Sequence, residues 1–195
     1  MKKYSLKIFG CGVFARQVAN IYLNNFPNSN VIFVDKNAKS GEKFWDFDVL
    51  KTCDENMPTF VAFGNNEKRK IYNHNELNII SKTAFIGENI NIGLGNFIGI
   101  NCVIECDIQC GNGNIINTSS IISHECKIGN YCHISVNSTL CGKVTLGNNV
   151  FVGAGATIVD KINICDNVII GANSTVINDI TEPGIYVGCP VKKIC

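Results

Sequence analysis

The sequence predicts a small α/β domain over residues 1–80, a short Rossmann-like parallel sheet with helices, followed by a parallel β-helix over residues 81–195. Three observations support this. An aliphatic residue recurs at every sixth position of the second part. The first part lacks this period. Its apolar segments instead alternate between strand-like and helix-like patterns, with glycine turns between them.

The six-residue period extends from Ile86 to Val176, and every residue at that spacing is Ile, Leu or Val except Cys110. A helix repeats every 3.6 residues and a strand every 2, so neither explains it. Residues two positions before each aliphatic are mostly small or apolar. Glycine often follows the aliphatic residue, as at Gly87 and Gly129, where we expect it to supply the positive φ of a turn. The pattern is typical of hexapeptide repeats, in which three hexapeptides form one triangular coil.

Charge and cysteine content narrow the class of protein. The net charge of +1 indicates neither a general nucleic-acid-binding surface nor a membrane-binding one. No apolar run approaches the roughly 20 residues of a membrane span. The eleven cysteines are odd in number and follow no secretion signal, so we expect free thiols in the cytoplasm. Cys102, Cys126 and Cys132 stand at the small inward position of the repeat. Because short CxxC pairs are missing around them, we expect core packing and no metal.

The first 80 residues predict strands over 6–9, 31–34 and 59–63, and a helix over 14–25. Gly10, Gly12 and Ala15 fit a glycine-rich phosphate turn, and Asp35 follows about 20 residues later. About 80 residues are too few for a complete dinucleotide fold, so a mononucleotide or its pyrophosphate fits better. The alternative is a tight turn that binds nothing. A second turn at Gly64 opens a helix with Arg69, which either approaches the same ligand or is a solvated helix start.

Two histidines stand within the repeat. His124 precedes Glu125, and a histidine with a carboxylate partner is a suitable general base near neutral pH. His133 follows nine residues later, half a coil away, so the two could meet across a subunit interface. The alternative is two exterior histidines without function. Each buried aliphatic contributes roughly 1.5–3 kcal/mol, whereas ordering each residue costs about 1–2 kcal/mol. One ladder residue in six is too few, so we expect a homo-oligomer.

Four segments carry a resemblance to a known family: residues 61–70 (VAFGNNEKRK), 117–120 (NTSS), 124–129 (HECKIG) and 188–193 (GCPVKK). The chain resembles bacterial hexapeptide-repeat sugar acetyltransferases over nearly its whole length, and is most similar to the N-acetyltransferases of the bacillosamine pathway. The sialic acid O-acetyltransferases belong to the same group. The resemblance implies a left-handed β-helix, a homotrimer with active sites at subunit interfaces, and acetyl-CoA as donor. The implied acceptor is the amino group of a nucleotide-linked 4-amino-4,6-dideoxy sugar.

The resemblance also implies roles for individual residues. His124 would be the general base, oriented by Glu125, with Asn117 near the sugar amine. His133 and the backbone at Gly142 would face the thioester carbonyl of acetyl-CoA. The remaining implied contacts are with the pantetheine and phosphates of the donor, from Gly171, Pro190 and Lys192, and with the nucleotide, from Gly10, Gly12, Asp35, Asn65 and Arg69.

One position departs from the family. Its glycine loop commonly reads Gly-Gly-His, whereas this chain has Gly12-Val13-Phe14. Phe14 therefore alters a contact to the nucleotide sugar, and UDP, dTDP and GDP all stay open as the nucleotide.

Three other functions fit parts of the pattern. A sugar O-acetyltransferase acting on sialic acid would share the fold, the donor and the base. A zinc enzyme of the γ-carbonic anhydrase type needs three histidines at an interface, and the repeat region has two. A non-catalytic β-helix scaffold would bind no acetyl-CoA. We favour direct transfer, without an acyl-enzyme intermediate on a cysteine.

Overall fold

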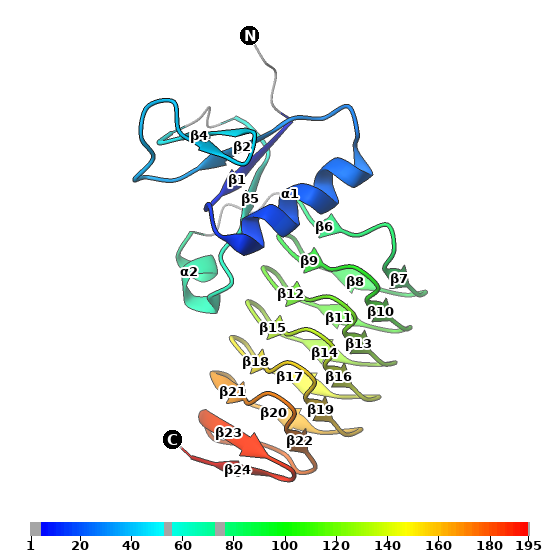
Figure 1. Cartoon of the computed structure of the whole chain (residues 1–195). Helices are drawn as coiled ribbons and strands as arrows, with labels where there is room; N and C mark the ends of the chain where they lie inside the picture. Colours follow the sequence, from blue (N-terminus) through cyan, green and yellow to red (C-terminus); the bar gives the residue numbers. More distant parts are fainter. Residues whose placement is uncertain (1–4, 53–55, 73–76, 195) are drawn as a thin grey trace.

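The computed structural model describes residues 5–52, 56–72 and 77–194. A small N-terminal sheet with two helices lies beside the first coils of a long β-helix, and the C-terminus lies at the far end of that β-helix (Figure 1). Within the described residues, neither helix is long and apolar enough to cross a membrane.

The N-terminal sheet has five strands in the order β3-β4-β2-β1-β5. All neighbouring strands are parallel except β3 and β4, which are antiparallel. Helix α1 (Val13–Asn25) buries Ala15, Val18, Ala19 and Ile21 against this part of the chain. The strands are β1 (Leu6–Phe9), β2 (Val31–Val34), β3 (Lys43–Phe44), β4 (Phe47–Leu50) and β5 (Thr59–Val61), and the second helix is α2 (Asn66–Ile71).

These elements confirm the strand and helix alternation that the sequence predicts. The β3–β4 hairpin has no counterpart in that prediction, because its strands are short and carry no clear period.

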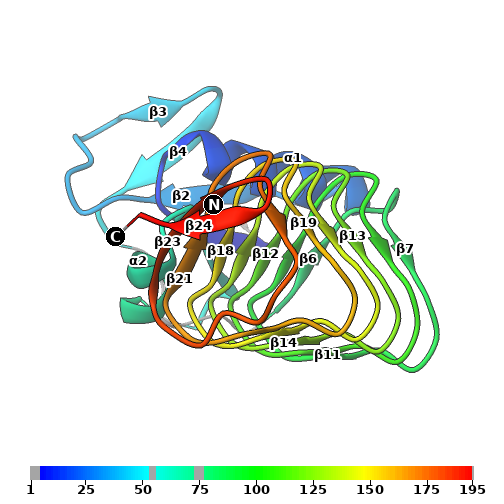
Figure 2. The same cartoon turned by 90° about the horizontal axis from the view of Figure 1, so that it is seen from below.

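The β-helix has a triangular outline when viewed along its axis (Figure 2). Each strand pairs in parallel with the strand one coil later, as Ile122 does with Leu140, so equivalent positions are 18 residues apart. The first strand starts at Ile79, two residues before the expected boundary.

Three sheets form its faces. The first face contains β6 (Ile79–Ile80), β9 (Phe97–Ile98), β12 (Ile115–Ile116), β15 (His133–Ile134), β18 (Phe151–Val152), β21 (Val168–Ile170), β23 (Gly184–Gly188) and β24 (Val191–Lys193). The second contains β7 (Phe85–Ile86), β10 (Val103–Ile104), β13 (Ile121–Ile122), β16 (Thr139–Leu140), β19 (Thr157–Ile158) and β22 (Thr175–Val176). The third contains β8 (Asn91–Ile92), β11 (Gln109–Cys110), β14 (Lys127–Ile128), β17 (Thr145–Leu146) and β20 (Asn163–Ile164).

The core of the β-helix consists of the six-residue ladder and the small residues two positions before it. From Ile98 to Val176 every ladder residue is buried, which confirms the predicted inward stacking. Cys102, Cys126 and Cys132 are buried at the small inward position and Cys110 on the ladder, all as free thiols. Burial raises the pKa of the Cys110 and Cys132 thiols to about 12. These cysteines therefore act as small hydrophobic residues.

The glycines that follow the ladder residues have another purpose than the sequence predicts. Positive φ occurs two residues further along, mostly at asparagine, as at Asn89 (φ 57°) and Asn101 (φ 55°). Gly129 does not have positive φ. A Cβ atom there would lie 2.5 Å from the carbonyl oxygen of Gly147 in the next coil. The prediction of turn glycines at these positions is therefore wrong: glycine is needed there because adjacent coils approach too closely for a side chain.

This close approach makes Gly129→Ala a destabilising substitution. The new methyl group contacts backbone that cannot rotate away, so we expect the free energy of unfolding to fall by about 1–3 kcal/mol. The control is Gly64→Ala, where a Cβ atom would meet nothing within 4 Å. Urea unfolding of the two variants beside the wild type measures the difference. Equal midpoints for both variants would contradict the packing explanation.

The junction between the two parts is packed and hydrogen-bonded. Phe97 and Ile115, on the outer side of the first face, belong to the same core cluster as Ala15 and Val18 of α1. The Phe14 ring meets that of Phe97 edge-on, with centroids 4.9 Å apart. Polar contacts add to this: Gln17 Nε2 donates to Thr118 Oγ1 (3.3 Å), and Asn25 Nδ2 donates to the carbonyl of Ile80 (2.6 Å). The N-terminal part is thus fixed against the first face.

Candidate functional site

His124 lies at the corner between the second and third faces, directly after β13. Its Nδ1 is 3.2 Å from Glu125 Oε1, and Lys143 Nζ is 3.5 Å from the same oxygen. A carboxylate only accepts hydrogen bonds, so Nδ1 carries the proton of the neutral ring and Nε2 keeps a free lone pair. Glu125 has a φ of 60°, and its carboxylate lies beside the ring of the preceding residue. All three side chains are about half exposed, so this base is open to a substrate.

Gly142 occupies the same corner one coil later. A Cβ atom there would lie 2.6 Å from both Cε1 and Nε2 of His124, so only glycine leaves room for the ring. Within the described residues, the backbone N–H of Gly142 donates no hydrogen bond. A lone pair and a free N–H donor therefore lie side by side, as needed to deprotonate an amine and polarise a carbonyl group.

His133 forms a second group on the first face. Its Nδ1 is 3.3 Å from the carbonyl oxygen of Gly64, and its Nε2 is 3.4 Å from Nδ2 of Asn117. A carbonyl only accepts, so Nδ1–H donates to Gly64 and Nε2 accepts from Asn117. Burial, reinforced by the charge of Arg69, lowers the pKa of His133 to about 4. This imidazole is therefore neutral at physiological pH.

The lowered pKa makes stability depend on pH. The unfolded chain binds the proton near the ordinary pKa of 6.5, whereas the folded chain binds it only near 4. The stabilisation is therefore complete above pH 6.5 and is lost as pH falls towards 4, by about 3 kcal/mol in total. Urea unfolding between pH 7 and pH 4 should show a steeper loss for the wild type than for His133→Asn. Parallel profiles would contradict a neutral His133.

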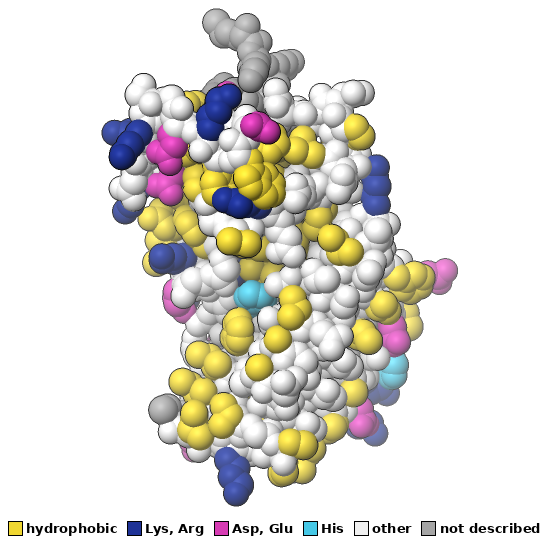
Figure 3. All heavy atoms as spheres, viewed as in Figure 1, with side chains coloured by type: hydrophobic (Ala, Val, Ile, Leu, Met, Phe, Trp, Pro, Cys, Tyr) yellow, Lys and Arg dark blue, Asp and Glu magenta, His cyan; other side chains and the backbone are white. Residues whose placement is uncertain are grey.

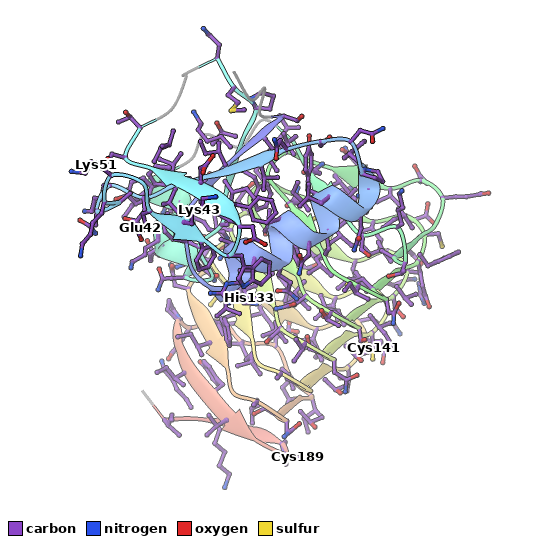
Figure 4. The ribbon with its side chains drawn as sticks, turned by 45° about the horizontal axis from the view of Figure 1, so that its top comes forward. Glu42, Lys43, Lys51, His133, Cys141 and Cys189 are labelled. Carbon is purple, nitrogen blue, oxygen red and sulfur yellow. The ribbon has the colours of Figure 1, made fainter. Side chains whose placement is uncertain are left out.

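The two histidine groups lie on different sides of the β-helix. Figure 4 shows His133 where the N-terminal part meets the first face, and shows Cys141, the neighbour of Gly142, at a distant edge. The structure thus joins Asn117 to His133 and His124 to Glu125 and Gly142. It does not bring these two half-sites together within one chain.

The residues expected to hold a nucleotide follow three adjacent parallel strands. Gly10, Asp35 and Gly64 come after β1, β2 and β5, so they lie along one edge of the sheet. Gly10 has a φ of 114°, which favours glycine. Gly12 is the N-cap of α1 and has open space beside it. Asp35 Oδ1 accepts from the backbone of Asn37 (2.9 Å).

Two further nucleotide candidates have structural roles. Asn65 caps α2 by accepting from the backbone N–H of Lys68 (2.9 Å). Phe14 packs on Phe97, facing the β-helix.

Arg69 differs from the sequence prediction. It is 1% exposed, and its guanidinium nitrogens donate to six acceptors within the protein. A guanidinium has five N–H groups, so no donor is left over for a nucleotide. The expected contact between Arg69 and the nucleotide is therefore corrected: the side chain turns away from the ligand edge and into the junction with the β-helix.

The residues expected to bind the donor lie at the lower end of the first face. The N–H of Gly171, after β21, donates to Tyr186 in β23 (2.8 Å). Pro190 lies in the turn between β23 and β24, and Lys192 in β24.

A cavity of about 290 Å³ opens on the same face, between residues 64–67 on one side and Asn149, Phe151, Asn167 and Ile169 on the other. Figure 3 shows hydrophobic side chains at the junction and again at the lower end of the β-helix, with most charged side chains at the margins.

Sequence reasoning missed two residues of the His124 group. Lys143 contacts Glu125 from one coil below, and Glu105 Oε2 accepts from the backbone N–H of His124 (3.0 Å) from one coil above. A spacing of 18 residues, read together with the six-residue period, would have found Lys143. In the described part of the chain, no cluster of three or more His, Cys, Asp or Glu could hold a metal ion.

Comparisons with known proteins agree with this fold. The family described as bacterial transferase hexapeptide (six repeats) matches residues 143–178. Among curated proteins, no sequence matches the chain significantly.

Solved structures match far more of the chain. PerB from Caulobacter crescentus, in complex with CoA and GDP-perosamine, is 25% identical with a TM-score of 0.87, over 98% of this chain and 97% of that one. The acetyltransferase domain of PglB from Neisseria gonorrhoeae FA1090 is 22% identical with a TM-score of 0.89, over 97% and 98%. The same domain in complex with acetyl coenzyme A is 22% identical with a TM-score of 0.87, over 98% and 100%. These findings confirm the predicted resemblance to hexapeptide-repeat sugar acetyltransferases.

Proposed function

We propose that this hexapeptide-repeat protein is an acetyl-CoA-dependent N-acetyltransferase that acetylates the amino group of a nucleotide-linked 4-amino-4,6-dideoxy sugar. One observation carries the proposal: Nε2 of His124 lies over Gly142, whose N–H is free, while Glu125 binds the opposite ring nitrogen. The structures similar over nearly the full chain include complexes with acetyl coenzyme A, and with CoA and GDP-perosamine.

The reaction follows from this arrangement as direct transfer. Nε2 of His124 takes a proton from the sugar amine as its nitrogen attacks the thioester carbonyl carbon. The N–H of Gly142 donates to the carbonyl oxygen, where negative charge develops. Collapse of the intermediate breaks the C–S bond, and the imidazolium returns its proton to the departing thiolate. Glu125 stabilises the imidazolium. The products are the N-acetyl sugar and CoA.

The N-terminal sheet is the proposed Rossmann-like nucleotide-binding domain, over residues 1–80. Gly10 and Gly12 would allow the diphosphate close to the N-terminus of α1, where backbone N–H groups and the helix dipole favour anions. Asp35 and Asn65 would contact the nucleoside. Because Phe14 packs on Phe97, this chain lacks the polar contact that the family's histidine would supply there.

A homotrimer would complete the site. The proposed acetyl-CoA lies along the first face, past His133 and Gly171, with Pro190 and Lys192 at its phosphate end. The His124 half-site of a second subunit would then face Asn117 and His133 of the first. Such a protein would work in the cytoplasm, where the free thiols stay reduced.

A thiol-release assay tests the function directly. Acetyl-CoA is offered with UDP-, dTDP- and GDP-linked 3-amino and 4-amino sugars, and with free sialic acid. We expect fast CoA release with one 4-amino nucleotide sugar, because an amine placed at His124 Nε2 is the nucleophile that the site can activate. Turnover of sialic acid alone would indicate an O-acetyltransferase. No turnover with any acceptor, together with no acetyl-CoA binding, would indicate a scaffold.

A further inference from the structure

Arg69 is the largest of the fully buried side chains described in this protein. Its Nε donates to the carbonyl of Gly113 (2.9 Å), and Nη1 donates to those of Phe63 (2.9 Å) and Gly64 (3.0 Å). Nη2 donates to Asn66 Oδ1 (2.8 Å) and to the carbonyls of Tyr131 (3.3 Å) and Cys132 (3.0 Å). Three acceptors belong to the N-terminal part and three to the β-helix, so one side chain joins both.

This contact is an unusual way to hold two parts of a chain together. None of the six acceptors is a carboxylate, so the positive charge is balanced only by carbonyl dipoles. Burial lowers the pKa of Arg69 to about 10, and the group stays charged at neutral pH. Apolar packing generally stabilises such a junction at least as well as a buried charge. What apolar packing cannot do is fix the position of several carbonyl groups at once, as the planar guanidinium does.

One of those carbonyls, that of Gly64, also accepts from Nδ1 of His133. Arg69 therefore fixes the acceptor that determines which nitrogen of His133 carries the proton. Asn117 completes the chain of contacts, because its Oδ1 accepts from the backbone N–H of Thr118 (2.8 Å), which turns its Nδ2 towards His133 Nε2. The tautomer of His133 is thus determined from both sides.

We propose that Arg69 is a positioning residue of the acetyl-transfer site: by clamping the Gly64 carbonyl to the β-helix, it holds His133 as the Nδ1–H tautomer with its Nε2 lone pair towards Asn117. The link to transfer rests on the proposed function. The effect on His133 does not, since it concerns this chain alone. In this tautomer Nε2 has no proton to donate to the thioester carbonyl, so that task falls to the N–H of Gly142. His133 and Asn117 instead present a fixed polar surface to the acceptor sugar.

Three variants test the proposal. Arg69→Met removes the charge and all six hydrogen bonds, and Arg69→Lys keeps the charge but loses the planar fork. Lys68→Met is the matched control, because Lys68 precedes Arg69 in α2 and is exposed. The readout is ¹⁵N NMR of the His133 imidazole in the full-length protein without ligands, titrated between pH 7 and pH 4, after each variant is shown to unfold cooperatively.

We expect a single Nδ1–H tautomer in the wild type and in Lys68→Met, and mixed tautomers in both Arg69 variants. The pKa of His133 should rise in Arg69→Met, because a nearby positive charge is lost, and should rise less in Arg69→Lys. With an active acceptor, kcat should fall by about 10- to 100-fold in both variants, with a smaller change in KM for acetyl-CoA.

An unchanged tautomer and pKa in folded Arg69→Met would overturn the proposal. Unfolding of both Arg69 variants would also overturn it, leaving Arg69 as a structural clamp only. The NMR experiment needs no substrate. Failure of the wild type to transfer acetyl groups would therefore refute the proposed function without affecting the result for Arg69.

Discussion

His124→Ala should lower kcat by about 10²–10⁴-fold while leaving acetyl-CoA affinity nearly intact. The substitution removes the only lone pair placed over Gly142, so the attacking amine keeps its proton. Donor binding is preserved, because the proposed donor contacts lie on the first face, at Gly171 and the C-terminal hairpin. Thiol release gives kcat, and isothermal titration with CoA gives the affinity.

The control for this experiment is Lys127→Ala, an exposed residue of β14 that touches neither half-site in the structure. It should retain wild-type kcat. A His124→Ala enzyme with normal kcat would place the base elsewhere. A variant that loses CoA binding together with activity would make His124 a donor-binding residue instead of a base.

Mixing two inactive variants should restore activity if each site is shared between subunits. His124→Ala disables one half-site and His133→Ala the other. When the two chains are co-refolded in equal amounts, random assembly leaves roughly a quarter of the interfaces with both halves intact. We therefore expect roughly a quarter of the wild-type rate, from two proteins that are each nearly inactive.

A second mixture controls for unspecific recovery. His124→Ala and Glu125→Ala damage the same half-site, so no combination of these chains restores it, and the mixture should stay inactive. Recovery in both mixtures would point to chain-independent rescue. Recovery in neither would mean that the half-sites do not meet between subunits, and the homotrimer proposal would fail.

The fold was largely predictable because a β-helix writes its geometry into the sequence. The period from Ile86 to Val176 requires no knowledge of contacts, since every ladder residue sees the same environment. The role of the glycines was not predictable in the same way. Gly129 and Asn89 both stand near a corner, and only the backbone geometry shows that one avoids a clash while the other adopts positive φ.

The site was predictable only where its residues are neighbours in sequence or match the family. His124 and Glu125 are adjacent, and their contact was expected from that alone. Lys143 was missed because its contact with Glu125 crosses one coil. Arg69 was assigned to the ligand because a basic residue in a short helix is usually solvated. Its burial depends on carbonyls at Gly113, Tyr131 and Cys132, and backbone carbonyls leave no trace in the identity of their residues.

The strict 18-residue coil gives the first face the character of a graduated scale. His133 stands three strands before β23, and neighbouring strands are about 4.8 Å apart, so about 14 Å separates it from the terminal hairpin. The number of coils, and no individual side chain, sets this span. Inserting or deleting a whole coil would lengthen or shorten it by one graduation without disturbing either histidine. The reach available to the donor's flexible arm is therefore encoded as an integer.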